Sequence, residues 1–336
     1  MNATLEQWKN LFHAAEQFKQ AACWKWMDNS HLFGVEDPVS KEIGYCCIMG
    51  NGGEMYGIAV YRGTRGLDSY IEAASGGDSD DIPFTQDCLM LSFDSRDDLH
   101  PEEYKRIKEL GLKFRGAHAW PTFRIYEPGY YPWPIEDWEH VQFLTHALQQ
   151  AIEVSRDYRS DPDALHEPED ERILTRVSAE DGANLVWSDQ WLTPKPEKNE
   201  SKPEFKINEL RLAKIRKSLE GITEAWVMDC FYMPFPVKED GRPYFPMMFL
   251  LADRNSGQIL HFHLFDGTAV TEEIAEQFLN LIEQVKVIPK EILIIRESAV
   301  EYLGAILDTL NIEVYVVEHE PLLEEIKNGL IGSFHQ

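Results

Sequence analysis

Two acidic side chains stand where their positions in the sequence suggest chemistry. Asp229 lies inside the apolar run 225–233, and an unpaired carboxylate there would be costly to bury. Glu297 directly follows a second apolar run, 291–296. If the two runs are neighbouring strands, both carboxylates reach one edge of a sheet, where they could share a Mg²⁺ or Mn²⁺ ion for phosphoryl transfer. The alternative is that Glu297 serves only the start of a helix at Ser298.

A pair of histidines at alternate positions is a second candidate site. His261 and His263 lie in the apolar run 258–265, and alternate residues of a strand point to the same face. A His-x-His pair can bind zinc when a third ligand joins it. Three residues could supply that ligand: Glu318, His319 and Asp229. The alternative is ordinary polar packing on a strand.

The segment 127–138, EPGYYPWPIEDW, is rich in aromatic residues and proline. Its side chains Tyr130, Tyr131 and Trp133 could line a pocket for a small molecule, because such pockets are mostly aromatic and apolar. The alternative is an ordered loop whose rings cover the core. The motifs GxSxG, GxxxxGK[ST], GxGxxG and HExxH are absent, so the sequence does not indicate a serine hydrolase, a P-loop or Rossmann nucleotide site, or a zinc protease.

The elements that would position these residues follow one pattern in the C-terminal part. Apolar runs separated by turn-forming residues predict antiparallel strands at 225–233, 244–252 and 258–265. Helical periodicity and capping signals then alternate with short apolar runs, which predicts helices at 271–285, 298–310 and from Pro321, and strands at 291–296 and 312–317. The expected order is β-β-β-α-β-α-β-α, an α/β domain around a mixed five-stranded sheet.

The N-terminal part mixes helices and strands without a βαβ rhythm, which predicts an α+β domain. Helices are expected at 4–22, 66–74, 101–110 and 137–156, and strands at 43–49, 55–61, 88–93 and 173–177 with 185–192. A further strand is expected within 113–126, interrupted at Pro121. The segment 193–205 is rich in Pro, Lys and Glu and is typical of a linker. We therefore expect domains at 1–192 and 206–336.

Composition restricts the partners and the compartment. The chain has 336 residues and a net charge of −26, and its part 206–336 has 12 basic and 21 acidic residues, a balance of −9. Because proteins that bind nucleic acid neutralise phosphates with clustered Lys and Arg, nucleic acid is a disfavoured partner. No secretory signal or membrane-length apolar run is visible, so we expect no membrane association. Five cysteines without CxxC spacing favour reduced thiols in the cytoplasm.

The predicted order of elements, with Trp226-Val227-Met228-Asp229 in its first strand, resembles the ribonuclease-H-like fold of retroviral-type integrases and transposases. In that family the first strand carries a metal-binding aspartate, a second acid ends the fourth strand, and a third comes from a following helix. The resemblance implies a catalytic metal site at Asp229, Glu297 and a late glutamate, for which we take Glu324. Glu297 stands where that family has aspartate. The whole chain also resembles a two-domain family of uncharacterised bacterial proteins, known only as domains of unknown function.

Three functions are compatible with these observations. The favoured one is a non-enzymatic cytoplasmic protein with a catalytically degenerate ribonuclease-H-like domain, which binds another protein through an acidic surface. The second is a divalent-metal-dependent phosphodiesterase or nuclease that uses Asp229 and Glu297. The third is a small-molecule binding protein that uses the aromatic loop 127–138.

Overall fold

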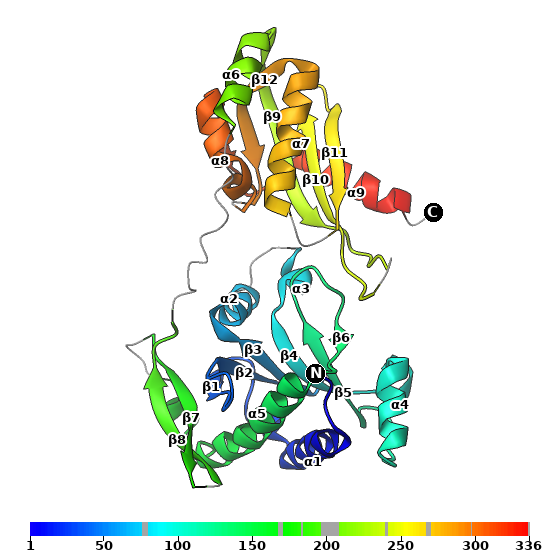
Figure 1. Ribbon diagram of the computed structural model, residues 1–336, viewed down its shortest axis with the longest axis vertical. Helices are drawn as coiled ribbons and strands as arrows, with labels where there is room; N and C mark the ends of the chain where they lie inside the picture. The colour runs from blue at the N-terminus through cyan, green and yellow to red at the C-terminus, as the bar shows by residue number, and fades with distance from the viewer. Residues whose placement is uncertain are drawn as a thin grey trace. The chain divides into compact units, whose positions relative to one another are not determined.

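The computed structural model describes residues 1–75, 80–166, 171–182, 184–195, 208–238, 241–266, 270–296 and 298–334. The chain forms two compact units. The first comprises Met1–Pro128 with Pro132–Glu200, and the second comprises Gly129–Tyr131 with Ser201–Gln336. Each unit combines helices with one mixed β-sheet (Figure 1). The expected linker 193–205 lies mostly outside the described residues and stays a prediction.

The first unit is built on an eight-stranded sheet with the order β6-β5-β4-β3-β2-β1-β7-β8. Neighbouring strands are antiparallel except β1 and β7, which run parallel. The strands are β1 (Phe33–Glu36), β2 (Ile43–Met49), β3 (Gly57–Arg62), β4 (Cys88–Asp94), β5 (Trp120–Tyr126), β6 (Trp133–Pro134), β7 (Ile173–Asp181) and β8 (Asn184–Leu192). The short strand β1, which the sequence pattern did not predict, joins the β7–β8 hairpin to this sheet.

Helices cover both faces of the first sheet. They are α1 (Leu5–Ala21), α2 (Gly63–Ala74), α3 (Ile82–Thr85), α4 (Pro101–Glu109) and α5 (Trp138–Asp157), with 3₁₀ turns at Cys23–Lys25, Arg96–Asp98 and Pro162–Leu165. The long helices α1 and α5 lie side by side (Figure 1), and their apolar residues form the main core with the strands. Leu67 of α2 packs with Tyr45 and Tyr61 on the other face. A capping box of Thr4 and Gln7 starts α1.

One feature of the first sheet corrects the expectation from sequence. The strand β5 runs through Pro121, which pairs with Phe93 of β4, whereas an interruption was expected there. Its other neighbour, β6, pairs only with Arg124 and Ile125. Pro121 therefore lies on a stretch of β5 with one strand neighbour, where a missing backbone N–H need not remove a ladder hydrogen bond.

The second unit contains the predicted order β-β-β-α-β-α-β-α, preceded by one helix. Its five-stranded sheet has the order β11-β10-β9-β12-β13. The strands β9, β10 and β11 are joined antiparallel, whereas β12 is parallel to both β9 and β13. The elements are α6 (Glu209–Ser218), β9 (Gly221–Tyr232), β10 (Met247–Asp253), β11 (Ile259–Phe265), α7 (Val270–Val285), β12 (Val287–Ile294), α8 (Ser298–Leu310), β13 (Glu313–Val316) and α9 (Pro321–Phe334).

The two faces of the second sheet have separate cores. Helices α6, α7 and α8 cover the face that carries Trp226 and Met228. Helix α9 covers the opposite face, where Leu323 packs with Val227 and Phe231 (Figure 1). Helix α9 therefore covers the face of the sheet that carries the odd-numbered residues of the central strand β9. Within the described residues, none of the helices has the length and apolarity that a membrane crossing requires.

Candidate functional site

Among the described residues of the second unit, Asp229 is the most buried charged side chain. It lies on the central strand β9 opposite Leu250 of β10, and its exposed fraction is 0%. Because side chains alternate along a strand, Asp229 shares a face with Val227 and Phe231, under helix α9. A carboxylate in such a place needs a compensating charge.

Two basic side chains supply that charge. Arg296 Nη1 lies 2.5 Å from Asp229 Oδ1, and Lys327 Nζ lies 3.7 Å from Asp229 Oδ2. Both cations are themselves well covered, with side-chain exposures of 15% for Arg296 and 13% for Lys327. The ammonium group of Lys327 also lies 4.6 Å from the ring centroid of Phe231. We call these three residues the Asp229 cluster.

The fold explains why these three residues meet. Strand β12 runs parallel to β9 with Ile294 opposite Met228, so Arg296 follows the strand end that lies beside Asp229. In α9, Lys327 lies one turn after Leu323, whose side chain is fully buried, and helical residues four apart share a face. Lys327 is thus a basic residue on the apolar face of its helix.

The charges of the Asp229 cluster bear on metal binding. The described ion pairs bring one carboxylate and two basic groups together. A divalent cation favours a site rich in oxygen ligands and negative charge. Asp229 Oδ2 has no hydrogen-bond partner among the described residues, because Lys327 is beyond hydrogen-bond distance. The cluster is suited to hold the end of β12 and helix α9 on β9 by charge.

The other predicted acids do not join this cluster in the described residues. Glu297 lies outside the described part of the chain. Glu324 is exposed on the first turn of α9, and its carboxylate pairs with His319 at 2.6 Å. Glu320 is buried, with an exposure of 5%, and pairs with Arg254 at 3.2 Å. The structure thus brings basic residues to Asp229 that the sequence pattern did not single out.

The two histidines of β11 lie on the same face, as the alternation requires. Their rings are nearly parallel, with centroids 6.5 Å apart. His261 Nε2 lies 3.1 Å from Oε1 of Gln277 on α7, so this nitrogen carries the ring proton. Burial lowers the pKa of His261. Among the described residues, no third His, Cys, Asp or Glu completes a metal-binding group with them.

The aromatic residues of segment 127–138 are divided between the two units. Tyr130 and Tyr131 count with the second unit, where the Arg242 guanidinium lies 5.0 Å from the Tyr130 ring centroid and Arg242 Nε donates to the Tyr131 carbonyl at 2.9 Å. Trp133 belongs to β6 of the first unit, and its ring packs on His100 with centroids 4.5 Å apart. The Tyr131 ring packs on Phe245 with centroids 5.9 Å apart, so each of the three rings has a packing partner.

A polar network in the first unit was not predicted from the sequence. The buried carboxylate of Asp87 accepts hydrogen bonds from Arg62, at 2.5 and 3.1 Å, and from Arg65 at 2.6 Å. Arg62 Nη1 lies 3.2 Å from His140 Nε2, and His140 Nδ1 lies 2.6 Å from Asp137 Oδ2. Because a guanidinium only donates, His140 Nε2 must accept and its ring proton lies on Nδ1. Arg62 Nη2 also lies 3.9 Å from Glu127 Oε1, and the network joins β3, α2, α5 and the residue that precedes β4.

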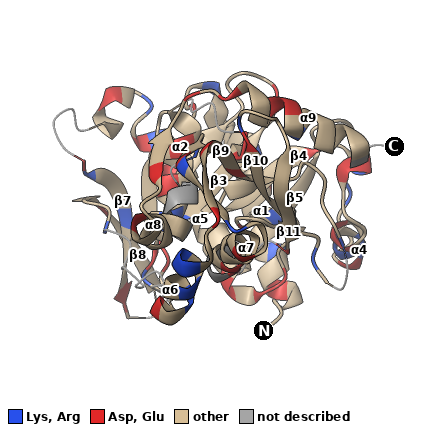
Figure 2. Ribbon diagram, turned by 90° about the horizontal axis from the view of Figure 1, so that it is seen from above, with Lys and Arg blue, Asp and Glu red and all other residues tan. Residues whose placement is uncertain are grey.

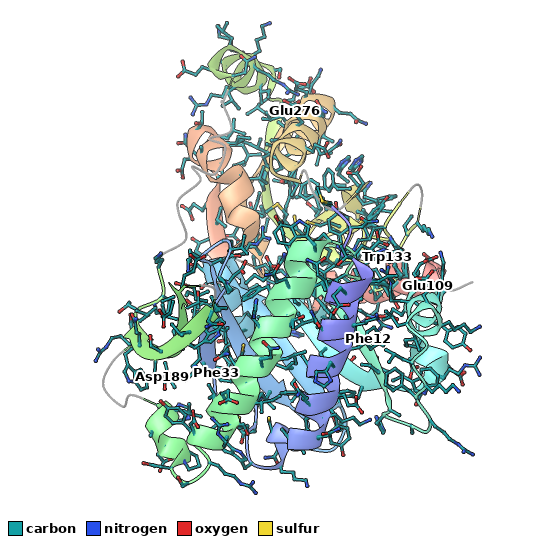
Figure 3. The ribbon with its side chains drawn as sticks, turned by 60° about the horizontal axis from the view of Figure 1, so that its bottom comes forward. Phe12, Phe33, Glu109, Trp133, Asp189 and Glu276 are labelled. Atoms are coloured by element: carbon teal, nitrogen blue, oxygen red, sulfur yellow. The ribbon has the colours of Figure 1, made fainter. Side chains whose placement is uncertain are left out.

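The basic residues of helix α6 form the cluster that most resembles a nucleic-acid-binding surface (Figure 2). Arg211 Nη1 donates to Glu276 of α7, which is labelled in Figure 3, at 2.6 Å. Arg211 Nε donates to Glu283 of the same helix at 3.0 Å. Hydrogen bonding to Glu283 is the largest of the effects that raise the pKa of Arg211. The charge of Arg211 is thus used within the second unit to hold α6 on α7.

Comparisons with known proteins place the chain among domains without an assigned activity. A search of the curated proteins and a search of the solved structures gave no match. Two family models match the chain: a domain of unknown function (DUF7309) over residues 8–176, which is half of the chain, and a domain of unknown function (DUF6930) over residues 211–331. The chain therefore belongs to the family of the domain of unknown function DUF7309, and its second part matches the model of DUF6930.

Proposed function

We propose that the second unit is a ribonuclease-H-like domain without metal-dependent catalysis, and that the protein acts by binding another protein. The observation that carries this proposal is the Asp229 cluster, in which Arg296 and Lys327 neutralise the carboxylate that the resemblance assigns to a metal.

The arrangement of the sheet supports the resemblance. In a ribonuclease-H-like domain the acid on the first strand and the acid at the end of the fourth strand must meet. Here the first and fourth strands, β9 and β12, are parallel neighbours, with Ile294 opposite Met228. The end of β12 therefore lies beside Asp229, as such a site would require.

The residues at that meeting point support the loss of catalysis. The resemblance places the second acid at the end of the fourth strand and the third on the following helix. In this chain Arg296, which directly precedes Glu297, and Lys327 of the later helix α9 contact Asp229. Two half-buried cations lie beside the carboxylate, and like charges repel a divalent metal ion. A metal-dependent phosphodiesterase needs the opposite arrangement of charge.

The charge of the chain supports a protein partner rather than nucleic acid. Asp and Glu total 58 residues and Lys and Arg total 32, a difference of −26. Several of the basic residues are paired with carboxylates, for example Lys286 with Glu220 and Lys290 with Glu224. The excess of acidic charge favours a partner with a basic surface, because complementary potentials speed association.

A metal titration of the full chain tests the proposal. Thermal unfolding is followed with and without millimolar Mn²⁺ or Mg²⁺ in the wild-type chain and in Lys327→Met, which removes one cation and keeps an unbranched apolar stem beside Phe231. Because an acidic chain binds divalent ions weakly everywhere, the decisive quantity is the difference in the metal-induced shift between wild type and Asp229→Asn. We expect equal shifts. A wild-type stabilisation that Asp229→Asn abolishes would establish a metal site and refute the proposal.

A further inference from the structure

The outer edge of strand β11 is an open backbone edge in the second unit. In the described sheet β11 is the last strand, and it pairs with β10 along one side only. Its sequence, ILHFHLF, contains no charged residue and no proline over seven residues. Native proteins protect such edges with charges, proline or short length, because unpaired N–H and C=O groups are a template for another strand.

The other edge strands of the described sheets carry such protection. In the second unit, β13 has only four residues and contains Glu313. In the first unit, β6 has two residues and ends in Pro134, and β8 contains Asp189. Strand β11 is therefore the edge with the fewest features that discourage pairing.

The side chains of β11 suit pairing with a copy of themselves. Phe262 and Leu264 are 55% and 39% exposed, and they lie on one face of the strand. His263 lies between them. A register irregularity beside Leu251 and Ala252 of β10 disturbs the strand before His261, so the regular part of the edge is 261–265. The centre of this regular part is His263.

We propose that β11 pairs antiparallel with β11 of a second copy of the chain, about a two-fold axis at His263. In this register Phe262 lies opposite Leu264 of the second copy and Leu264 lies opposite Phe262, so four apolar side chains cover one another. His263 faces its own counterpart. The contact is isologous, the symmetry that closes a dimer.

The charge of the chain favours this strand over other surfaces for self-association. Two copies that each carry −26 repel one another. The paired segment 261–265 contains no carboxylate, and the first acid beyond it, Asp266, would lie opposite Leu260 rather than opposite another acid. A dimer held by one strand pair is small, so we expect weak, concentration-dependent association. The proposal does not depend on the Asp229 cluster.

Sedimentation of the full chain over a concentration series tests the pairing. We expect the wild-type chain to pass from monomer to dimer below roughly 1 mM, the weak end of specific association. Phe262→Lys should raise the dissociation constant at least about tenfold, because it places a charge in the apolar seam. Ile222→Lys is the matched control: Ile222 is also exposed in a strand of the second unit, at 65%, and the charge change is the same.

Cross-linking tests the register. Residues opposite one another in an antiparallel pair can form a disulfide, and the five native cysteines are buried. Under mild oxidation His263→Cys should give a covalent dimer, and Ile222→Cys should not. A chain that stays monomeric over the whole series, a dimer that Phe262→Lys leaves intact, or equal cross-linking of the two cysteine variants would overturn the proposal.

Discussion

The Asp229 cluster allows a quantitative prediction about the variant Asp229→Asn. The substitution keeps the shape of the side chain and removes its charge. Arg296 and Lys327 are then left as two cations with side-chain exposures of 15% and 13% and without the carboxylate they share. Removing one partner of a buried ion pair typically costs about 3–5 kcal/mol, and we expect a loss of this size in the free energy of unfolding of the second unit.

Two comparisons isolate the charge effect from the chemical change. Asp253→Asn makes the same change on the neighbouring strand β10, where the carboxylate accepts hydrogen bonds from Ser256 at an exposed position, and should cost about 1 kcal/mol. Lys327→Met leaves the Asp229–Arg296 pair in place and should also cost about 1 kcal/mol. In the double variant Asp229→Asn with Arg296→Gln, the cost should fall below the sum of the single costs, because the two residues form one ion pair.

The assay must report on the second unit within the full chain. Of the nine tryptophans, only Trp226 lies in the second unit, and it is almost fully buried. Fluorine NMR of the chain labelled with 5-fluorotryptophan therefore resolves its unfolding in urea from that of the first unit. If Asp229→Asn costs no more than Asp253→Asn, the cations do not depend on Asp229 and the reasoning is wrong.

Three further predictions follow from burial and backbone geometry. Burial lowers the pKa of His261 below its ordinary value of 6.5, so the folded chain resists protonation there. Its stability should therefore fall as the pH drops from 6.5 through the lowered pKa. The urea midpoints at about pH 7.5 and pH 5.5 should differ less in His261→Gln than in the wild type. All five thiols are buried, and burial raises the pKa of Cys47 to about 12. A disulfide reagent at mildly alkaline pH should therefore modify the native chain far more slowly than the unfolded chain. Rapid reaction of even one thiol in the native chain would contradict this prediction. A Cβ on Gly57 would lie 2.1 Å from the carbonyl oxygen of Leu91, so Gly57→Ala should cost about 2 kcal/mol or more in thermal unfolding, whereas Gly52→Ala, with open space around it, should cost clearly less.

The order of elements in the second unit was readable from the sequence because each element has a clear period and a clear boundary. The capping signal at Ser298 and the proline at 321 start α8 and α9 where the structure has them. The burial of Asp229 was also expected, since its neighbours on β9 are apolar. Periodicity and caps are local properties, and the sequence states them directly.

The partners of Asp229 could not be found in the same way. Arg296 ends an apolar run, and Lys327 interrupts the apolar face of a helix. At neither position does the local sequence indicate which residue the side chain pairs with. One signal was available: Lys327 falls between Leu323 and Leu330 on the helical period, which puts a basic residue on the buried face of α9. Similarly, β1 has only four residues, and its pairing with β7 depends on residues 141 positions away, beyond the reach of any local pattern.

The assignment of Gly129–Tyr131 to the second unit has a consequence for the order of events during synthesis. Tyr131 N–H donates to the Pro243 carbonyl and Phe245 N–H donates to the Gly129 carbonyl. These three residues leave the ribosome more than a hundred residues before their hydrogen-bond partners, because translation proceeds from the N-terminus. During synthesis, residues Gly129–Tyr131 therefore lack these two hydrogen bonds until Pro243 and Phe245 have been translated.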